Sequence, residues 1–151
     1  MEIFELSDKK ELLDDAVNYF WKCWGSSTNY AFYKDCIINS LSQENRLPKF
    51  YIGIVDNQII ASYALLTNDI ISRQDLMPWF ACLFVNPEFR KLGYAGLLLE
   101  HGATEAKKKG FKNFYLATDL ENFYERKGGN YFTEGYNVSG EGLKVYIKST
   151  E

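Results

Sequence analysis

The sequence predicts a mixed α/β (α+β) fold, in which a mostly antiparallel central sheet of about six to seven strands is flanked by about four helices. Short runs rich in β-branched and aromatic residues alternate with stretches of helical spacing, and two pairs of these runs are joined by hairpin-type turns. A continuous apolar run at residues 80–85 also leads through a glycine-bearing turn into a helix. The 151 residues suffice for one hydrophobic core, so we expect a single domain over residues 1–151.

The N-terminal third is predicted to hold one strand and two helices. Residues 1–6 form a short strand, and Asp8 and Glu11 are spaced as a capping box for a helix that runs to about residue 21. The apolar residues of this helix follow one stripe: Leu12, Leu13, Ala16, Val17, Phe20 and Trp21. Thr28 or Asn29 can cap a second helix that runs to about residue 42.

The middle of the chain is predicted to form three strands and a long helix. Residues 49–55 and 59–67 read as an antiparallel hairpin around a polar turn, Asp56-Asn57-Gln58. The strand at residues 80–85 ends at Pro87, because proline cannot donate to a sheet. The helix begins at Gly93 and ends at Gly110, which is placed for a left-handed cap.

The C-terminal part is predicted to hold a strand, a short helix and a hairpin. The strand covers residues 113–118, and Asp119 can cap a helix that reaches Lys127 and ends at Gly128. Residues 131–138 and 143–148 then form a hairpin around a glycine-containing turn.

The turn before the long helix has the chemistry of an anion site. The first N–H groups of a helix have no intrahelical partner, and the helix dipole favours negative charge there. Gly93 lets an anion approach the backbone, while Arg90 and Lys91 add positive charge, so a pyrophosphate suits the turn. The turn lacks the Gly-Lys-[Ser/Thr] of an ATP-binding P-loop and the Gly-x-Gly-x-x-Gly of a Rossmann dinucleotide site. For an isolated loop of this kind, close packing of the helix on the sheet would be the alternative explanation.

The segment Arg90-Lys-Leu-Gly93-Tyr-Ala95 resembles the [Gln/Arg]-x-x-Gly-x-[Gly/Ala] signature of the GNAT superfamily of N-acetyltransferases. The downstream strand 113–118 and the block Phe123-Tyr-Glu-Arg-Lys-Gly128 are also similar to segments of that family. The resemblance implies a GNAT-like fold over most of the chain, with acetyl-CoA as the donor and CoA as the product. It implies direct acetyl transfer to a primary amine of a small molecule. The alternatives are a peptide or protein amino group as acceptor, or a non-catalytic acyl-CoA sensor.

The resemblance also implies roles for individual residues. The backbone N–H groups of Leu83, Phe84 and Val85 would hold the pantetheine and polarise the thioester carbonyl, and Tyr124 would be the general acid. The pyrophosphate would lie on the turn, formed by Arg90, Lys91, Leu92, Gly93, Tyr94, Ala95 and Gly96. Thr118 stands near the position where many members have a pantetheine-binding Asn, and its hydroxyl is the candidate substitute.

The general base is left open by the sequence. Many members carry a glutamate on the strand before the turn, whereas residues 79–85 contain no carboxylate. Asp69, Asp75 or a chain of water molecules would serve instead. Cys82 lies on this strand, but we expect a buried, inert thiol rather than an acetyl-cysteine intermediate, because no histidine is near it in sequence.

Composition limits the partners of the chain. A net charge of −3 without a large basic cluster argues against nucleic acid, and no apolar run is long enough to span a membrane. The three cysteines are odd in number and lack metal-ligand spacing, and no signal peptide precedes them, so we expect a cytoplasmic protein without a metal. A homodimer is left open.

Overall fold

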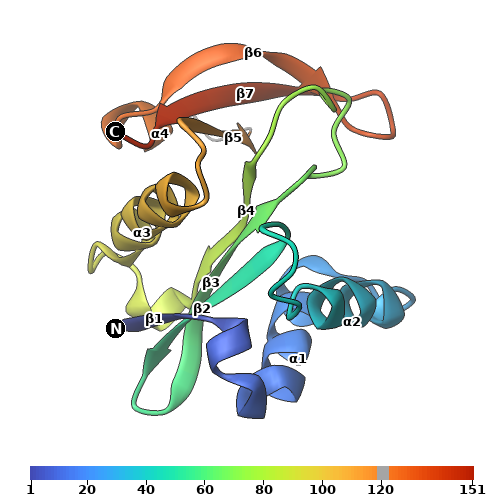
Figure 1. Cartoon of the computed structure of the whole chain (residues 1–151), viewed down its shortest axis with the longest axis vertical. Helices are drawn as coiled ribbons and strands as arrows, with labels where there is room; N and C mark the ends of the chain where they lie inside the picture. Colours follow the sequence, from blue (N-terminus) through green and yellow to red (C-terminus); the bar gives the residue numbers. More distant parts are fainter. Residues whose placement is uncertain (119–122) are drawn as a thin grey trace. The chain divides into compact units, whose positions relative to one another are not determined.

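The computed structural model describes residues 1–118 and 123–151, which form two compact units (Figure 1). Unit 1 comprises Met1–Ala64 and Cys82–Leu98, and unit 2 is drawn from Leu65–Ala81 and Leu99–Glu151. The described residues form four α-helices and seven strands, hydrogen bonded in the order β1-β2-β3-β4-β5-β7-β6. The predicted mixed fold, with a mostly antiparallel sheet and about four helices, is confirmed.

The sheet of unit 1 begins with three strands. β1 (Glu2–Glu5) pairs antiparallel with β2 (Lys49–Val55), and β2 turns into β3 (Gln58–Leu66), whose residues up to Ala64 belong to this unit. The two residues between β2 and β3, Asp56 and Asn57, have φ angles of 50° and 63°. Two consecutive left-handed residues define the type I′ turn that suits a two-residue hairpin, and Asn and Asp tolerate this conformation best.

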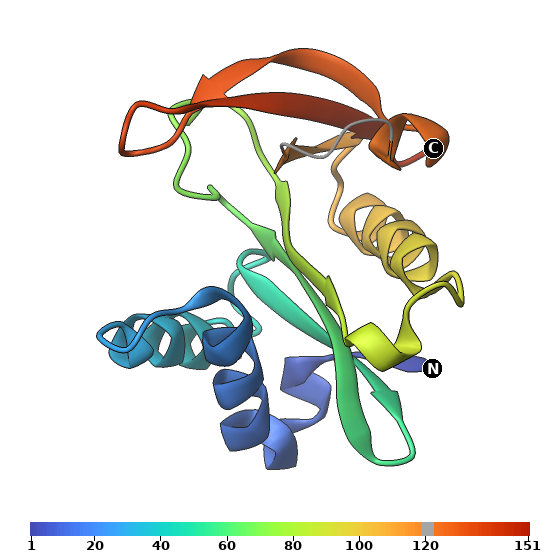
Figure 2. The ribbon, with the colours of Figure 1, turned by 180° about the vertical axis from the view of Figure 1, so that it is seen from behind.

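Two helices cover one face of β1–β3, as Figure 1 and Figure 2 both show. Two 3₁₀ turns (Leu6–Asp8 and Lys10–Leu12) precede α1 (Leu13–Trp24), and α2 (Tyr30–Asn39) follows. Phe20 of α1 packs edge-on against Phe50 of β2, with ring centroids 5.0 Å apart, and both side chains are buried. The apolar stripe of α1 therefore points to the sheet, as predicted.

The predicted capping interactions of these helices are wrong. The N-cap of α1 is Leu12, which makes no side-chain cap bond, because Asp8 and Glu11 lie in the two 3₁₀ turns. Asn29 does occupy the N-cap position of α2, but its Oδ1 accepts from the Ser26 N–H at 2.7 Å instead of from the helix.

Lys49 secures the end of α2 from inside unit 1. Its side chain is only 3% exposed, and its Nζ donates to the carbonyl oxygens of Ser40 and Ser42 at 3.2 and 2.7 Å. We expect Lys49→Met to lower the free energy of unfolding by about 2 kcal/mol, because two charge-assisted hydrogen bonds are lost and two carbonyls remain without their donor. Lys34→Met makes the same change at an exposed position of α2 and should have an effect below about 0.5 kcal/mol. Urea unfolding measures both, and equal midpoints would contradict the role of Lys49.

Unit 2 contains the other end of the sheet. The first residues of β4 (Trp79–Val85) pair in parallel with β5 (Asn113–Thr118) at Trp79 and Tyr115. β5 pairs antiparallel with β7 (Gly142–Ser149), and β7 pairs antiparallel with β6 (Asn130–Tyr136). Ile71, Trp79 and Val145 form the centre of an apolar core beneath these strands.

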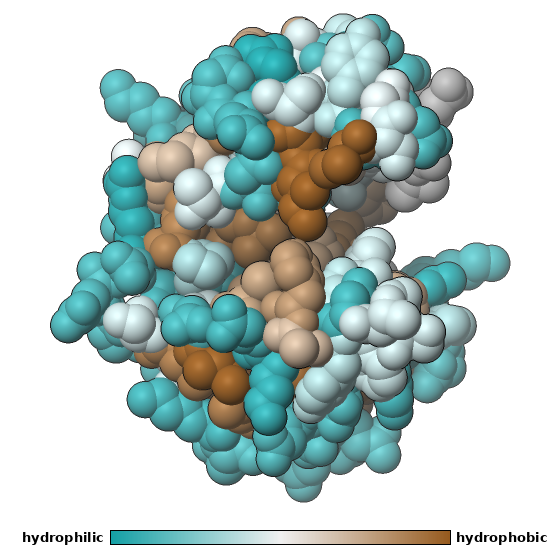
Figure 3. All heavy atoms as spheres, turned by 90° about the vertical axis from the view of Figure 1, so that its right-hand side faces the viewer, coloured by the Kyte–Doolittle hydropathy of each residue, from teal (hydrophilic) through white to brown (hydrophobic). Residues whose placement is uncertain are grey.

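Both helices of the second half end as the glycines predict. α3 (Tyr94–Lys108) is followed by Gly110, with a φ of 89°, and α4 (Phe123–Arg126) by Gly128, with a φ of 84°. The predicted cap at Asp119 lies outside the described residues. Among the helices that are described, none combines the length and the apolar character that crossing a membrane requires. Hydrophilic side chains cover much of the face drawn in Figure 3, and apolar side chains gather between them.

Candidate active site

The strand that leads to the predicted anion site has an irregular backbone at its middle. Cys82 has a φ of 56°, in the left-handed region that interrupts the extended conformation of β4. The Ser62 hydroxyl donates to the Cys82 carbonyl at 2.9 Å and supports this conformation from β3. The residues before Cys82 are buried, whereas Leu83 and Phe84, two of the three residues predicted to hold pantetheine, are half-buried. Non-glycine residues with such a strained backbone conformation occur at functional sites more often than elsewhere.

The turn after β4 is open above its backbone. It runs through a 3₁₀ turn (Pro87–Phe89) and then through two left-handed residues, Lys91 with a φ of 65° and Gly93 with a φ of 82°. A Cβ placed on Gly93 would find no heavy atom within 4 Å. α3 begins at Tyr94, with no acidic residue in its first turn, so its first N–H groups face no negative side chain of their own helix.

Arg90 is held in place beside this turn. Its Nε donates to the Val85 carbonyl at 2.9 Å, and its guanidinium lies over the Phe84 ring, 5.3 Å from the ring centroid. Among the described residues, no carboxylate forms an ion pair with Arg90. Its positive charge is therefore available to an anion on the turn.

Two aromatic residues of α1, Tyr19 and Trp24, contact the same strand end. The Tyr19 hydroxyl donates to Asn86 Oδ1 at 2.7 Å, and the Tyr19 ring meets the Phe84 ring edge-on at 6.2 Å. The Trp24 ring also packs edge-on against Phe84, at 6.4 Å. Burial raises the pKa of Tyr19 well above its usual range, so its hydroxyl remains a donor. No sequence signal marks Tyr19 among the eleven tyrosines.

Tyr124, the predicted general acid, lies in unit 2 on α4. It is 7% exposed, and its ring contacts those of Phe123 and Tyr146, with centroids 4.9 and 5.9 Å away. The Gly129 N–H donates to its carbonyl at 2.7 Å. Burial, and then the negative charge of Asp69, raise the pKa of Tyr124 to about 12. Within the described residues no hydrogen bond engages its hydroxyl, which therefore carries a proton and lacks an acceptor.

The two candidate bases lie in unlike environments. Asp75 is paired with Arg73 through two hydrogen bonds of 2.8 and 3.0 Å, and this pairing lowers its pKa. Asp69 is half-buried, and the loss of solvent raises its pKa to about 6. A general base works best when its pKa lies near the operating pH, so the raised pKa of Asp69 suits this role and the lowered pKa of Asp75 does not.

The structure distributes the predicted site residues over the two units. Leu83 to Val85 and Arg90 to Gly96 are consecutive features of unit 1, whereas Asp69, Thr118 and Tyr124 belong to unit 2. Thr118 is the last residue of β5 and pairs with Lys144 of β7. Within residues 1–118 and 123–151, no three His, Cys, Asp or Glu side chains gather closely enough to hold a metal ion.

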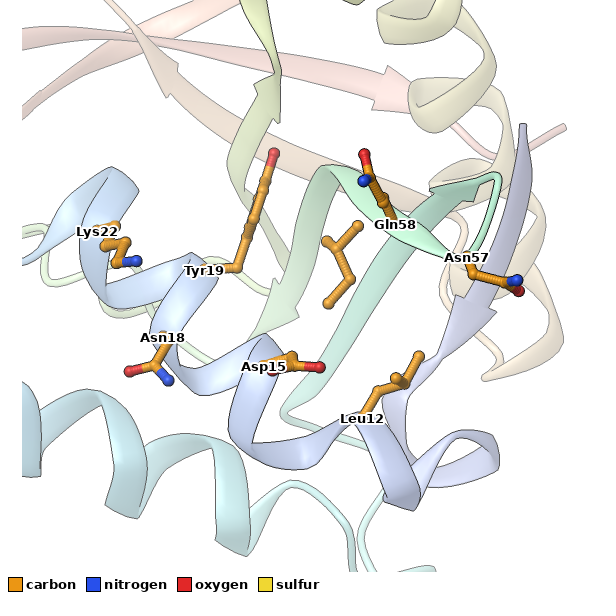
Figure 4. Close-up of a pocket in the computed structure, with 8 residues that line it drawn as sticks. Leu12, Asp15, Asn18, Tyr19, Lys22, Asn57 and Gln58 are labelled. Carbon is orange, nitrogen blue, oxygen red and sulfur yellow. The ribbon is translucent and has the colours of Figure 1, made fainter.

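A separate pocket with a volume of about 430 Å³ lies in unit 1. Figure 4 shows it between α1 and the β2–β3 turn. Its lining is largely polar and comprises Leu12, Asp15, Asn18, Tyr19, Lys22, Asn57, Gln58 and Ile59. None of the predicted donor-binding residues lines it. A second hollow lies on α2 beside Phe32, which is 49% exposed, while Ile37 of the same helix is fully buried. α2 therefore buries Ile37 in the core and leaves Phe32 half exposed.

The structure combines a mixed sheet with an irregular strand that leads into an open helix N-terminus beside Arg90. The family model for the Acetyltransferase (GNAT) family matches residues 11–128, and the chain belongs to this family. The predicted family and enzyme class are thereby confirmed.

Solved structures of the same fold cover nearly the whole chain. One is aminoglycoside 6'-acetyltransferase type Ii, with a TM-score of 0.75 and 17% identity over 100% of this chain and 98% of the other. A second, aminoglycoside 6'-N-acetyltransferase complexed with coenzyme A, has a TM-score of 0.74 and 14% identity, with the same coverage. A third is a chimera of spermidine N-acetyltransferase SpeG from Vibrio cholerae and hSSAT, with a TM-score of 0.70 and 12% identity over 99% and 97%. No curated protein matches the chain. The coenzyme A in the second structure agrees with the predicted donor.

Proposed function

We propose that the protein transfers the acetyl group of acetyl-CoA directly to a primary amine of a small molecule. The observation that carries this proposal is the β4–α3 turn, where Gly93 leaves the backbone open and Arg90 is fixed beside it. A diphosphate is the natural ligand for such a turn. The solved structures of the same fold include acetyltransferases named for aminoglycosides and for spermidine, which supports a small-molecule amine as the acceptor.

The reaction requires an unprotonated amine, a polarised carbonyl and a proton for the departing thiolate. The N–H groups of Leu83 to Val85 would polarise the thioester carbonyl, and Thr118 would contact the pantetheine. Tyr124 would protonate the thiolate. Its pKa of about 12 lies above the value of about 8.5 for a free thiol, but burial raises the pKa of a thiol in the same way. We propose a cytoplasmic enzyme, as predicted from its cysteines.

Calorimetry with acetyl-CoA, followed by a thiol-release assay, tests this function. We expect saturable acetyl-CoA binding and CoA release with spermidine or an aminoglycoside. Absence of acetyl-CoA binding would refute the proposal. Binding without thiol release from any amine would identify an acyl-CoA sensor, and release only with lysine-containing peptides would identify a protein or peptide acetyltransferase.

Tyr124→Phe is expected to lower kcat by about 100-fold while the Kd for acetyl-CoA changes by less than about twofold, because the variant removes one proton donor and keeps the ring contacts with Phe123 and Tyr146. Steady-state kinetics and calorimetry measure the two quantities. Tyr131→Phe removes the same hydroxyl from a 52% exposed ring and should leave kcat unchanged. Equal kcat values for Tyr124→Phe and Tyr131→Phe would show that Tyr124 serves only in packing.

A further inference from the structure

Tyr19 of α1 contacts the end of β4 at two points. Its hydroxyl donates to Asn86 Oδ1 at 2.7 Å, and its ring meets the Phe84 ring edge-on, with centroids 6.2 Å apart. The helix that carries Tyr19 is firmly placed, because the next residue, Phe20, is fully buried and packs against Phe50 of β2. Tyr19 therefore joins a fixed helix to the residues that precede the predicted anion site.

Asn86 links β4 to the turn. Its N–H donates to the Ile60 carbonyl of β3 at 2.8 Å, and its own carbonyl accepts the Phe89 N–H at 2.9 Å, which begins the 3₁₀ turn before Arg90. The Tyr19 hydroxyl holds the side chain of the same Asn86. The start of the turn that carries Arg90 is thus fixed by β3 through the backbone and by α1 through a side chain.

Phe84 connects Tyr19 to Arg90 by a second route. The Arg90 guanidinium lies over the Phe84 ring, 5.3 Å from the ring centroid. The rings of Tyr19 and Trp24 pack edge-on against this same ring, so they fix the surface on which the guanidinium lies. Tyr19 and Arg90 also interact electrostatically: burial raises the pKa of Tyr19, and the Arg90 charge opposes part of this rise.

We propose that Tyr19 is a positioning residue of the donor site, which holds Arg90 in the orientation that binds the diphosphate of acetyl-CoA. This inference rests on the proposed acetyltransferase function and adds a residue of α1 to it. Tyr19 acts through Asn86 and Phe84, and all of these residues belong to unit 1 together with Arg90. A guanidinium binds phosphate oxygens through directed hydrogen bonds, so its affinity depends on its orientation as well as on its charge.

Tyr19→Phe removes the hydrogen bond to Asn86 and keeps the ring beside Phe84. We expect the Kd for acetyl-CoA, measured by calorimetry, to rise about 10-fold, because Asn86 Oδ1 loses its donor and Arg90 its fixed orientation. The KM for acetyl-CoA should rise by a similar factor while kcat stays within about twofold, since the change affects donor binding and not the reacting thioester. Asn86→Ala removes the acceptor of the same bond and should raise the Kd at least as much.

Tyr33→Phe is the matched control in unit 1. The Tyr33 hydroxyl donates to the Trp24 carbonyl at 3.1 Å, so this variant also loses a phenolic hydrogen bond, but one that does not hold Asn86. We expect its Kd for acetyl-CoA to stay within about twofold of the wild-type value. Circular dichroism and thermal unfolding show whether each variant is folded at the assay temperature.

A double-mutant cycle distinguishes positioning from a general loss of stability. Arg90→Lys keeps the charge but removes the stacked guanidinium and its Nε donor, and we expect it to raise the Kd about 10-fold as well. If Tyr19 acts through Arg90, the double variant Tyr19→Phe/Arg90→Lys should bind acetyl-CoA only about 10- to 20-fold more weakly than the wild type. Independent effects would multiply to about 100-fold.

The outcomes separate this inference from the function on which it rests. If the wild type binds acetyl-CoA and Tyr19→Phe binds it equally tightly, or if only one of Tyr19→Phe and Asn86→Ala raises the Kd, the role of Tyr19 is overturned and the acetyltransferase function stands. An unchanged Kd in Arg90→Lys, multiplicative effects in the cycle, or equal losses in Tyr33→Phe and Tyr19→Phe would also overturn it. If the wild type does not bind acetyl-CoA, the proposed function itself fails.

Discussion

Gly93→Asp is expected to weaken acetyl-CoA binding by about 100-fold, which corresponds to about 2.7 kcal/mol. A Cβ at this position meets no heavy atom within 4 Å, so steric conflict at the Cβ is not the cause. The carboxylate instead places negative charge where we propose that the helix N-terminus and Arg90 bind a diphosphate. The φ of 82° adds a backbone cost of about 1–2 kcal/mol, which acts on the stability of the turn. Calorimetry with CoA and acetyl-CoA measures the loss.

Two controls separate the charge from the backbone. Gly93→Asn has nearly the same shape without the charge, and asparagine tolerates left-handed backbone, so it should retain most of the affinity. Gly140→Asp adds the same charge and strain elsewhere, because Gly140 has a φ of 84° and equally open surroundings, and it should bind acetyl-CoA normally. If Gly93→Asp bound acetyl-CoA with unchanged affinity, the assignment of the diphosphate site to this turn would be wrong.

Asp69→Asn is expected to raise the free energy of unfolding at pH 8 by up to about 3 kcal/mol. Burial raises the pKa of Asp69 from 3.8 to about 6, and each pKa unit corresponds to about 1.4 kcal/mol. Between these two pH values the folded state binds more protons than the unfolded state, so stability falls as the pH rises through about 4 to 6. Above pH 6 the full cost of ionising the desolvated Asp69 carboxyl group lowers the stability of the wild type. Asparagine does not ionise, so the variant lacks this cost.

Thermal or urea unfolding of both proteins from pH 4 to pH 8 checks this expectation. The stability gap should be widest at pH 8 and should close as the pH falls toward 4. For Asp75→Asn the sign is reversed, because Arg73 lowers the pKa of Asp75 and the pairing stabilises the fold at higher pH. A gap that is independent of pH would show that Asp69 is solvated. A variant that is more stable and less active would show that the enzyme keeps a destabilising charge for function.

Much of the scaffold could be predicted because its signals are local. Two residues with high turn propensity, Asp56 and Asn57, predict the hairpin, and Gly110 predicts the end of α3. Arg90 and Gly93 predict an anion site at the turn after β4, and this stays a prediction; the structure shows that the space beside Gly93 is open. The predicted capping box before α1 is wrong because Asp8 and Glu11 lie in two 3₁₀ turns that precede the helix.

The parts that could not be predicted depend on tertiary contacts. An apolar run does not reveal that Cys82 has left-handed backbone, and nothing in the helical stripe of α1 marks Tyr19 as a partner of Asn86. Asp69 and Asp75 are six positions apart, and the sequence alone does not distinguish their environments. Desolvation of one and an arginine beside the other distinguish them, and both follow from the path of the β3–β4 loop.

The double anchoring of Arg90 has a thermodynamic consequence. A free arginine side chain has about 2 kcal/mol of rotamer entropy, and an ordinary surface arginine loses much of this entropy when it binds an anion. Here the Val85 carbonyl and the Phe84 ring restrict those rotamers during folding, so the loss precedes encounter with any diphosphate. Lysine has a compact ammonium group on a flexible side chain. It lacks the planar guanidinium that stacks on a ring while its Nε donates a hydrogen bond, so it would not reproduce this preorganisation.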